Sequence, residues 1–454
     1  MKMIEHCFVS FADLLWGDWM LVLLIGLGVF YTIMTRGIQF RSIPWIWREL
    51  TGKDKQSSKD KQGRETNSDD SSKGISSMQA LFTGIASCVG SGNIVGVATA
   101  LIAGGPGALL WMWIAAFFGM ATKYGEIVLG MCYRSKDEKG MYAGGPMYYI
   151  AKGLGAPRLG AVVAVLLFIQ NGAATLIQSN TISSVMQDVH HVPKIVTGVV
   201  LAILMSFVIT GGLKRLAQVA QRVVPFMAGL YIVGGIIVIA VNVESFLPML
   251  RSIISGAFTF QAGVGAAAGY AVKQAMRFGV ARGLYSNEAG EGSAAVIHSS
   301  AEVDHPSRQG VYGVLEVFAD TMIICSTTGF VILSSGVELG GASAASLSAL
   351  AFSTVFPAMQ YVVSVSLVLF AATSIMSQWY FGHVSLTYLR SKRGDSIYKK
   401  IFPVLILLGS LSTIDMVWAI QDCMLGLLIV PNIIALFILS PKVAQKTKEF
   451  FLIK

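Results

Sequence analysis

Long apolar runs separated by short polar segments make up most of the chain. Each run is close to the length that crosses about 30 Å of hydrocarbon as a helix. They cover residues 19–35, 78–103, 108–133, 159–185, 195–210, 223–241, 252–272, 311–335, 358–382, 401–414 and 417–440. The last two are nearly fused, and the first of these is short. The pattern predicts an all-α polytopic membrane protein with about 11 transmembrane helices.

Basic residues divide between the predicted loops as membrane topology requires. Lysine and arginine collect on the cytoplasmic side of a membrane, and a count of eleven spans places most of the 34 on one side. The first run precedes Arg36 and Arg41 and follows acidic residues, the reverse of the charge order in a signal peptide. We expect the N-terminus outside and the C-terminus inside. The net charge of +9 therefore predicts no nucleic-acid partner.

The runs divide the chain into five parts. Residues 1–50 hold an extracellular N-terminus and the first helix, and residues 51–77 are polar and predict a flexible cytoplasmic loop. Two five-helix units follow at 78–245 and 246–440, and residues 441–454 form a cytoplasmic tail. A duplicated unit with an odd number of spans returns upside down, which is the inverted repeat of secondary transporters.

The run between Thr83 and Gly107 is unusual at its centre. Residues 87–96 include three glycines, two serines, a cysteine and an asparagine. Glycine costs about 1 kcal/mol against alanine in a helix, and serine and asparagine compete with the backbone for hydrogen bonds. Transporters build sites from helices that break in this way. Alternatively, Gly92 and Gly96 form a small-xxx-small step that lets two helices pack closely.

A second glycine-rich stretch opens the second five-helix unit. Residues 252–300 run from an apolar Gly/Ala segment into a polar one, with glycines at 279, 283, 290 and 292. This departure from a plain span predicts a second broken helix, as an inverted repeat requires.

Several polar side chains fall inside predicted spans. Gln178, near Asn171 and Asn180, predicts either hydrogen bonding between helices or a binding site. Thr373 and Ser374 place two hydroxyls in the ninth span, where such groups often bond their own helix. Charged residues also fall inside predicted spans, namely Lys123, Glu126, Glu316 and Asp320.

The charged residues predict pairing inside the membrane. Lys123 and Glu126 lie three apart, the spacing of a local ion pair, and near the cytoplasmic end they could snorkel to the surface. We expect a structural or gating pair. Glu316 and Asp320 lie four apart, and either a cation path or pairing with Lys123 would satisfy them.

Composition and motifs exclude other classes of protein. The chain is 54% hydrophobic and 13% charged, where a soluble domain carries about 25% charge. The five cysteines are scattered without a CxxC pair and predict reduced packing residues. His298, Asp304 and His305 do not have a recognised metal spacing. No G-x-S-x-G elbow, P-loop or H-E-x-x-H occurs, so no enzyme is predicted.

Six blocks of sequence are more specific. VGSGNIVGVATAL, GGPGALLWMW, GMATKYGE, GGPMYYI, RGLYSNEAGEGS and RQGVYGVLEVFADTMIICSTTG resemble the signature blocks of the alanine or glycine:cation symporter family, in the expected order between about residues 78 and 390. The resemblance implies a leucine-transporter-like fold, with one extra helix before two inverted five-helix repeats whose first helices are broken. It also implies sodium-driven import of a small neutral amino acid across the bacterial cytoplasmic membrane.

The resemblance also assigns residues to the substrate. VGSGN matches the family's VGTGN, so the backbone N–H groups of Ser91 and Gly92 would face the substrate carboxylate at the positive end of a half-helix. Gln178 matches a binding-site glutamine. Trp379 resembles a tryptophan of the ninth helix that lines the pocket, although interfacial belt residues are the commoner role for a membrane tryptophan.

The resemblance implies sodium ligands as well. The carbonyls of Ala86 and Val89 and the hydroxyls of Thr373 and Ser374 would form an all-oxygen cage. Two positions depart from the family pattern. Ser91 replaces the usual threonine, which affects pocket size and substrate preference, and Glu291 adds a charge to a motif that usually reads SNEAGLGS.

Two other functions stay open from the sequence. A proton-coupled carrier would depend on Glu316, Asp320 or Glu126, and its uptake would follow pH rather than sodium. A membrane sensor or structural protein would use its glycines only to pack helices. The sequence predicts neither the preferred amino acid nor the oligomeric state.

Overall fold

Helices make up nearly all of the molecule. The computed structural model describes residues 2–51, 74–137, 140–258, 265–412 and 414–452, so most of the segment predicted as a cytoplasmic loop lies outside the described residues. Two short strand pairs lie at one end, where β1 (Ile75–Ser76) runs parallel to β4 (Ala301–Glu302) and β2 (Ser135–Lys136) runs antiparallel to β3 (Tyr142–Ala143).

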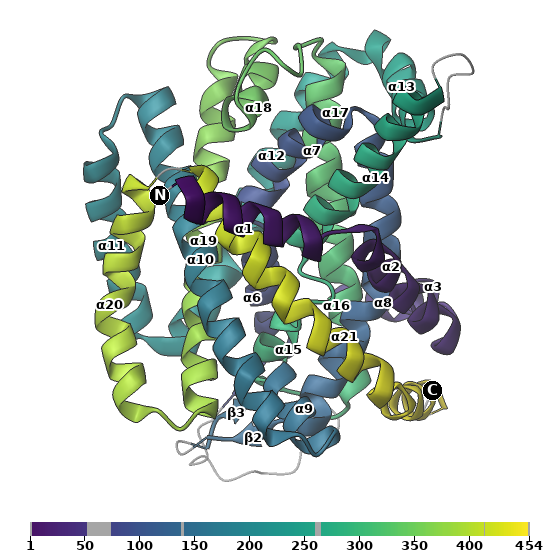
Figure 1. Cartoon of the computed structure of the whole chain (residues 1–454), viewed down its shortest axis with the longest axis vertical. Helices are drawn as coiled ribbons and strands as arrows, with labels where there is room; N and C mark the ends of the chain where they lie inside the picture. The colour runs from purple at the N-terminus through teal and green to yellow at the C-terminus, as the bar shows by residue number, and fades with distance from the viewer. Residues whose placement is uncertain (1, 52–73, 138–139, 259–264, 413, 453–454) are drawn as a thin grey trace.

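Among the described residues, the N-terminal part contains three helices that the apolar pattern does not predict. Its elements are α1 (Lys2–Leu15), α2 (Asp18–Met34), α3 (Ile38–Arg41) and α4 (Ile43–Leu50). The first apolar run corresponds to α2. Helix α1 crosses the bundle in Figure 1 and packs on the last helix, where the indole of Trp16 donates to the Asp422 carbonyl at 2.9 Å.

A broken helix opens the next part of the chain. In order, the elements are α6 (Ser77–Cys88), the 3₁₀ turn η1 (Ser91–Asn93), α7 (Val95–Gly104), α8 (Gly107–Tyr133), α9 (Pro146–Gly153), α10 (Pro157–His190), α11 (Lys194–Thr210) and α12 (Gly212–Val241). Helices α6 and α7 meet at a bend of 58°. The predicted break in the second apolar run is confirmed.

The second half of the chain also has a broken helix near its start. Its elements are η2 (Val243–Ser245), α13 (Phe246–Phe258), α14 (Gly265–Asn287), α15 (Ser293–His298), α16 (Pro306–Val317), the π-helix η3 (Phe318–Cys325), α17 (Ser326–Ser334), α18 (Ala344–Ser353), α19 (Met359–Tyr388), α20 (Lys392–Leu411) and α21 (Ile414–Leu452). The interruption between α14 and α15 is the predicted second broken helix.

The predicted span at 252–272 includes residues 259–264, which lie outside the described residues. Its first part belongs to α13 (Phe246–Phe258) and its last part to α14 (Gly265–Asn287). The short run at 401–414 understates α20, which begins at Lys392. Helix α21 continues without interruption to Leu452, through most of the segment expected as a tail. These helices include polar residues near one end, so the apolar pattern alone does not show where they begin and end.

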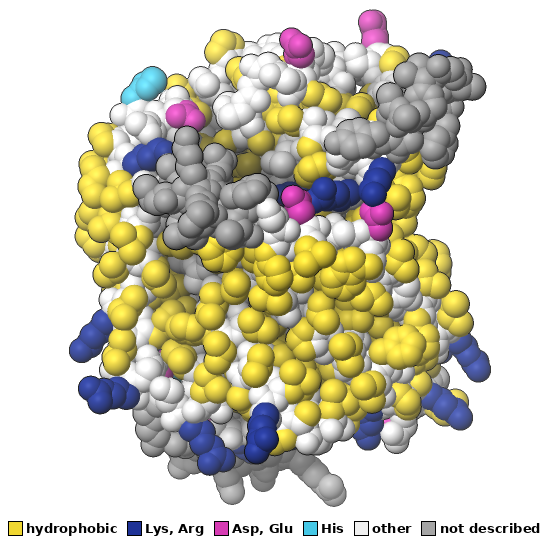
Figure 2. Space-filling model, in the orientation of Figure 1, with side chains coloured by type: hydrophobic (Ala, Val, Ile, Leu, Met, Phe, Trp, Pro, Cys, Tyr) yellow, Lys and Arg dark blue, Asp and Glu magenta, His cyan; other side chains and the backbone are white. Residues whose placement is uncertain are grey.

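The outer surface is suited to lipid. Figure 2 shows a broad apolar band around the middle of the molecule, with most of the visible lysines and arginines along its lower edge. Ile203 and Phe207 on α11 are 65% and 71% exposed. By length and composition, five described helices can span a membrane, or up to seven if each bent pair is one span. The protein is therefore an all-α polytopic membrane protein, and the count of eleven spans stays a prediction.

Candidate functional site

The first break is built from small residues and one asparagine. Helix α6 ends at Cys88, and the N–H of Gly90 donates to Asn93 Oδ1 at 2.9 Å. A Cβ atom on Gly90 would lie 2.7 Å from the Gln178 side-chain nitrogen, so only glycine lets the glutamine come this close. Gly96 has no atom within 4 Å of an added Cβ, so it makes no tight helix contact of the kind that a small-xxx-small step provides.

The second break lies against the first. Glu288, Gly290 and Gly292 adopt positive φ angles of 56°, 93° and 89°, which end α14 before α15 begins. Helix α6 packs against α15, and α7 packs against α14. The first half of each broken helix thus contacts the second half of the other, as expected for two units of opposite orientation.

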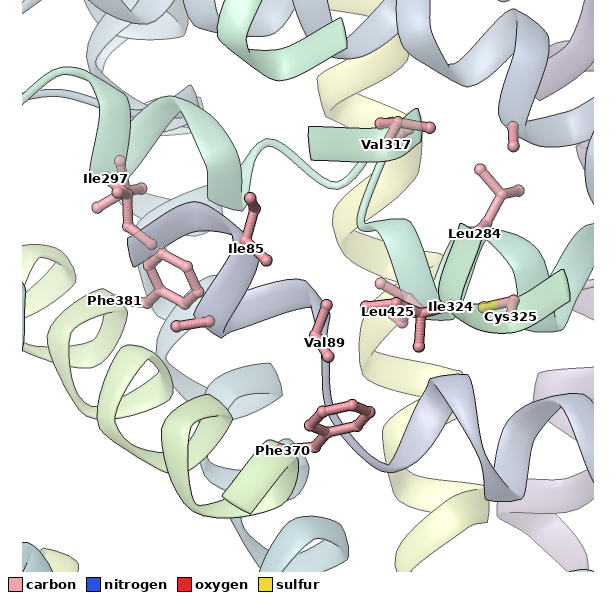
Figure 3. Close-up of a cluster of buried hydrophobic side chains, with 14 of the residues drawn as sticks. Ile85, Val89, Leu284, Ile297, Val317, Ile324, Cys325, Phe370, Phe381 and Leu425 are labelled. Atoms are coloured by element: carbon pink, nitrogen blue, oxygen red, sulfur yellow. The ribbon is translucent and has the colours of Figure 1, made fainter. Parts of the chain in front are cut away.

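Apolar side chains pack beside the breaks. Figure 3 shows Ile85 and Val89 of the first broken helix, with Phe370 and Phe381 of α19 beside them. All four side chains are at most 8% exposed. The polar groups of the breaks are therefore buried, so their hydrogen bonds face little competition from solvent.

A small cavity of about 10 Å³ lies where the breaks meet. Its lining is mostly polar and includes no lysine, arginine or histidine. The lining residues are Ser87, Cys88, Gly92, Gln170, Ala174, Gln178, Tyr285, Glu288, Glu291, Ser374, Gln378 and Gln421. The cavity draws on both breaks and on the long helices α10, α19 and α21.

The structure brings three of the predicted substrate residues together. The backbone N–H of Ser91 donates to Gln178 Oε1 at 3.0 Å, and both Gly92 and Gln178 line the cavity. The Gln178 side-chain oxygen therefore lies where the family resemblance places an oxygen of the substrate carboxylate. Trp379 is buried and stacks on His383 with ring centroids 5.4 Å apart. Its neighbour Gln378 faces the cavity instead.

The break changes the hydrogen bonding of the backbone carbonyls at the end of α6. Because the Gly90 N–H donates to Asn93, the Ala86 carbonyl has no α-helical partner. Such unpaired carbonyls carry the partial negative charge of a helix C-terminus. Ser374 Oγ donates to the Ser87 carbonyl at 3.1 Å, which joins α19 to this end.

The predicted sodium ligands share this location. Ala86, Val89, Thr373 and Ser374 are all buried. The Thr373 hydroxyl donates to the Leu369 and Phe370 carbonyls of its own helix. Carbonyl and hydroxyl oxygens are ligands of hard cations, so the donors that gather here fit sodium chemically.

A family model for the "Sodium:alanine symporter family" matches residues 1–453. The chain belongs to the sodium:alanine symporter family. It is accordingly an amino-acid symporter by family and not an enzyme, with sodium as the coupling ion that the family name implies. The resemblance inferred from the six sequence blocks is confirmed.

Relatives cover nearly the whole symporter. The chain is 38% identical to the sodium/alanine symporter AgcS of Methanococcus maripaludis, over 96% of this chain and 94% of that protein. It is 33% identical to the probable sodium/glutamine symporter GlnT of Bacillus subtilis, over 99% and 91%. A solved mutant of the Eremococcus coleocola manganese transporter superposes with a TM-score of 0.54 at 11% identity, over 82% and 80%. That likeness supports the leucine-transporter-like fold.

A buried charge cluster of the symporter lies beside the cavity. Lys123 Nζ lies 2.6 Å from Glu316 Oε1 and donates to the Asn287 carbonyl at 2.7 Å. His298 Nε2 lies 2.8 Å from Glu316 Oε2. The predicted pairing of Glu316 with Lys123 is confirmed. The local pair with Glu126 is wrong, because Glu126 accepts from Asn432 instead, and Lys123 is fully buried rather than snorkelling.

Asp320 joins the two breaks of the symporter. It accepts from Asn93 Nδ2 at 2.6 Å and Ser286 Oγ at 2.9 Å, one residue from each broken helix. It lies in the π-helix η3, and a π-helix often marks a functional site. Asp320 therefore has a role that the sequence leaves open, as a link between the breaks.

Sequence reasoning missed several residues of the symporter's cavity. Gln170, Gln378 and Gln421 line it, and the side-chain oxygen of each lacks a hydrogen-bond partner among the described residues. Amides inside apolar helices are the signal that could have found them. Among the amides predicted from the sequence, Asn180 donates from Nδ2 to carbonyls at the end of α20. This is hydrogen bonding between helices.

Proposed function

We propose that the protein imports a small neutral amino acid together with sodium by alternating access. The main support for the proposal is the hydrogen bond that the Ser91 N–H donates to Gln178 Oε1 at the cavity. A substrate carboxylate would displace this amide oxygen and accept from the N–H groups of Ser91 and Gly92, at the positive end of the half-helix. The Gln178 amide would then be free to donate to the same carboxylate.

Sodium would bind at the other side of the same break. The carbonyls of Ala86 and Val89 end α6, and Thr373 and Ser374 lie opposite on α19. An ion here would fix the break in the geometry that presents the Ser91 N–H. Because linkage between two sites is reciprocal, each ligand would then favour the binding of the other.

The proposed orientation follows from charge. The lower edge in Figure 2, where lysine and arginine collect, would face the cytoplasm. We place the N-terminus outside, the C-terminus inside, and the protein in the bacterial cytoplasmic membrane. Eleven spans would consist of one extra helix and two inverted five-helix repeats, with residues 78–245 and 246–440 as the repeats.

Uptake into proteoliposomes tests the proposal. Labelled alanine should accumulate under an imposed sodium gradient and not under a matched potassium gradient. Gly92→Leu should abolish uptake, because even a Cβ atom there would lie 3.1 Å from the Tyr285 ring. The matched control is Gly96→Ala, which should transport normally because an added Cβ meets nothing within 4 Å.

Two outcomes would contradict sodium symport. Uptake that follows a proton gradient without sodium would favour a proton-coupled carrier that uses Glu316, Asp320 or Glu126. No uptake of any small amino acid under any gradient would favour a sensor or structural protein.

A further inference from the structure

Glu291 is the one lining residue of the cavity that has both a formal charge and no partner among the described residues. Its neighbour Glu288 also lines the cavity, but Ser87 Oγ donates to both Glu288 oxygens at 2.9 and 2.8 Å, and Ser293 Oγ donates to one of them at 2.7 Å. Glu291 is 4% exposed. Its carboxylate is thus buried in the cavity wall without a compensating donor.

Three further acceptors share this wall. The unpartnered side-chain oxygens of Gln170, Gln378 and Gln421 come from α10, α19 and α21, and these residues are 3%, 4% and 1% exposed. Buried polar groups are rarely left without a hydrogen bond. Acceptors from three helices and the second break therefore converge on one enclosed space, and none of the donors that line it, such as the Tyr285 hydroxyl, bonds to them.

We propose that Glu291 is a specificity-determining residue, which makes the cavity select an uncharged amino acid whose side chain carries a hydrogen-bond donor. Serine, with a hydroxyl, and glutamine, with a primary amide, have such donors, and alanine has none. The inference rests on the proposed function, because the Ser91 N–H must hold the α-carboxylate for the side chain to reach this wall. The leucine that the family resemblance expects in place of Glu291 would provide no acceptor.

The discrimination follows from unpaired groups. A substrate with a side-chain donor gives Glu291 and the glutamine oxygens a hydrogen bond, whereas alanine leaves them unpaired in the occluded state. A site built around hydrogen bonds rejects an analogue without the donor far more strongly than an apolar pocket rejects an added hydroxyl. We therefore expect serine or glutamine to be preferred to alanine by about tenfold or more.

Sodium-driven uptake of labelled serine, glutamine and alanine tests this inference, with the wild type compared with Glu291→Leu and Glu291→Gln. Glu291→Leu should lower the uptake rate of the preferred polar substrate about tenfold, while the uptake rate of alanine should change less than about threefold. Glu291→Gln keeps an acceptor without the charge and should retain part of the preference. The control is Glu338→Leu, a substitution at an exposed glutamate outside the cavity lining, which should leave all three rates unchanged.

The results separate this inference from the proposed function. Sodium-driven uptake with the same ratio of polar substrate to alanine in the wild type and in Glu291→Leu would overturn only the role of Glu291. Ornithine that competes better than serine and glutamine would overturn the uncharged class. Absence of uptake of all three amino acids would overturn the proposed function itself. If Glu291→Leu does not fold, Glu291→Gln replaces it in the test. The inference is then overturned if the wild type takes up all three substrates at equal rates and Glu291→Gln has the same ratio of polar-substrate uptake to alanine uptake.

Discussion

The two breaks lie side by side, but different partners satisfy their free backbone groups. At the first, the Ser91 N–H donates to the neutral amide of Gln178 and the Ser87 carbonyl accepts from the Ser374 hydroxyl. At the second, the Asn287 carbonyl accepts from the ammonium of Lys123. The first break thus has neutral partners, and the second has a charged one fixed to the chain.

This difference suggests separate roles for the two breaks. A bound amino acid or ion can displace a neutral amide or hydroxyl, because little charge is left uncompensated when these move. The end of each first half-helix carries partial negative charge that favours a cation. At the second break Lys123 is that cation permanently, and at the first break the proposed sodium ion would take this place and could leave it. We infer that the second break supports the first.

The largest expected effect comes from removing the fixed cation. Lys123→Met leaves Glu316 as a buried charge without its ammonium partner, which is 2.6 Å away in the native protein, and leaves the Asn287 carbonyl without its donor. Breaking a buried pair in this way costs about 3–5 kcal/mol. Chemical or thermal unfolding of the purified protein in detergent should show a loss of that order.

A double variant separates the charge from the packing. Lys123→Met combined with Glu316→Gln removes both charges and should recover part of the lost stability, because no uncompensated charge remains. Equal stability of the wild type and Lys123→Met would show that the second break does not depend on its fixed cation.

The breaks themselves were predictable from sequence. Glycine, serine and asparagine in an apolar run oppose a continuous helix, and both VGSGN and SNEAGEGS contain the observed interruptions. The ends of helices were less predictable. Helix α20 begins at Lys392, well before the apolar run at 401–414, because hydropathy measures only the preference for lipid and polar residues also form helix.

Contacts between helices were the least predictable feature. Lys123 and Glu126 have the spacing of a pair on one helix, but the partner of Lys123 is Glu316 on a different helix. Which residues face each other there depends on how α8 and α16 cross. Similarly, Gln378 and Trp379 are one residue apart, and a rotation of about 100° around the helix decides which of them faces the cavity.

An intermediate effect is expected from Asn93, which connects the first break to Asp320. Asn93→Ala leaves the Gly90 N–H without its acceptor and removes one donor from Asp320. An unsatisfied buried group costs about 1–3 kcal/mol, so stability in detergent should fall by that amount and sodium-driven uptake should fall with it.

A matched asparagine gives the control for this change. Among the described residues, the Asn242 side chain donates to the Val238 carbonyl of its own helix end and to no other group, so Asn242→Ala should leave uptake nearly unchanged. If both variants transport equally well, Asn93 does not hold the first break in its active geometry.

The smallest expected effect concerns the ion at the first break. Ser374→Ala removes a hydroxyl that would bind sodium and that now donates to the Ser87 carbonyl. One such interaction is worth about 1 kcal/mol, so the sodium concentration for half-maximal uptake should rise about fivefold. Ser385→Ala is the control, because the Ser385 hydroxyl bonds the Phe381 carbonyl of its own helix and sodium dependence should not change. An equal shift in both variants would mean that the Ser374 hydroxyl acts through the stability of α19 and does not bind the ion.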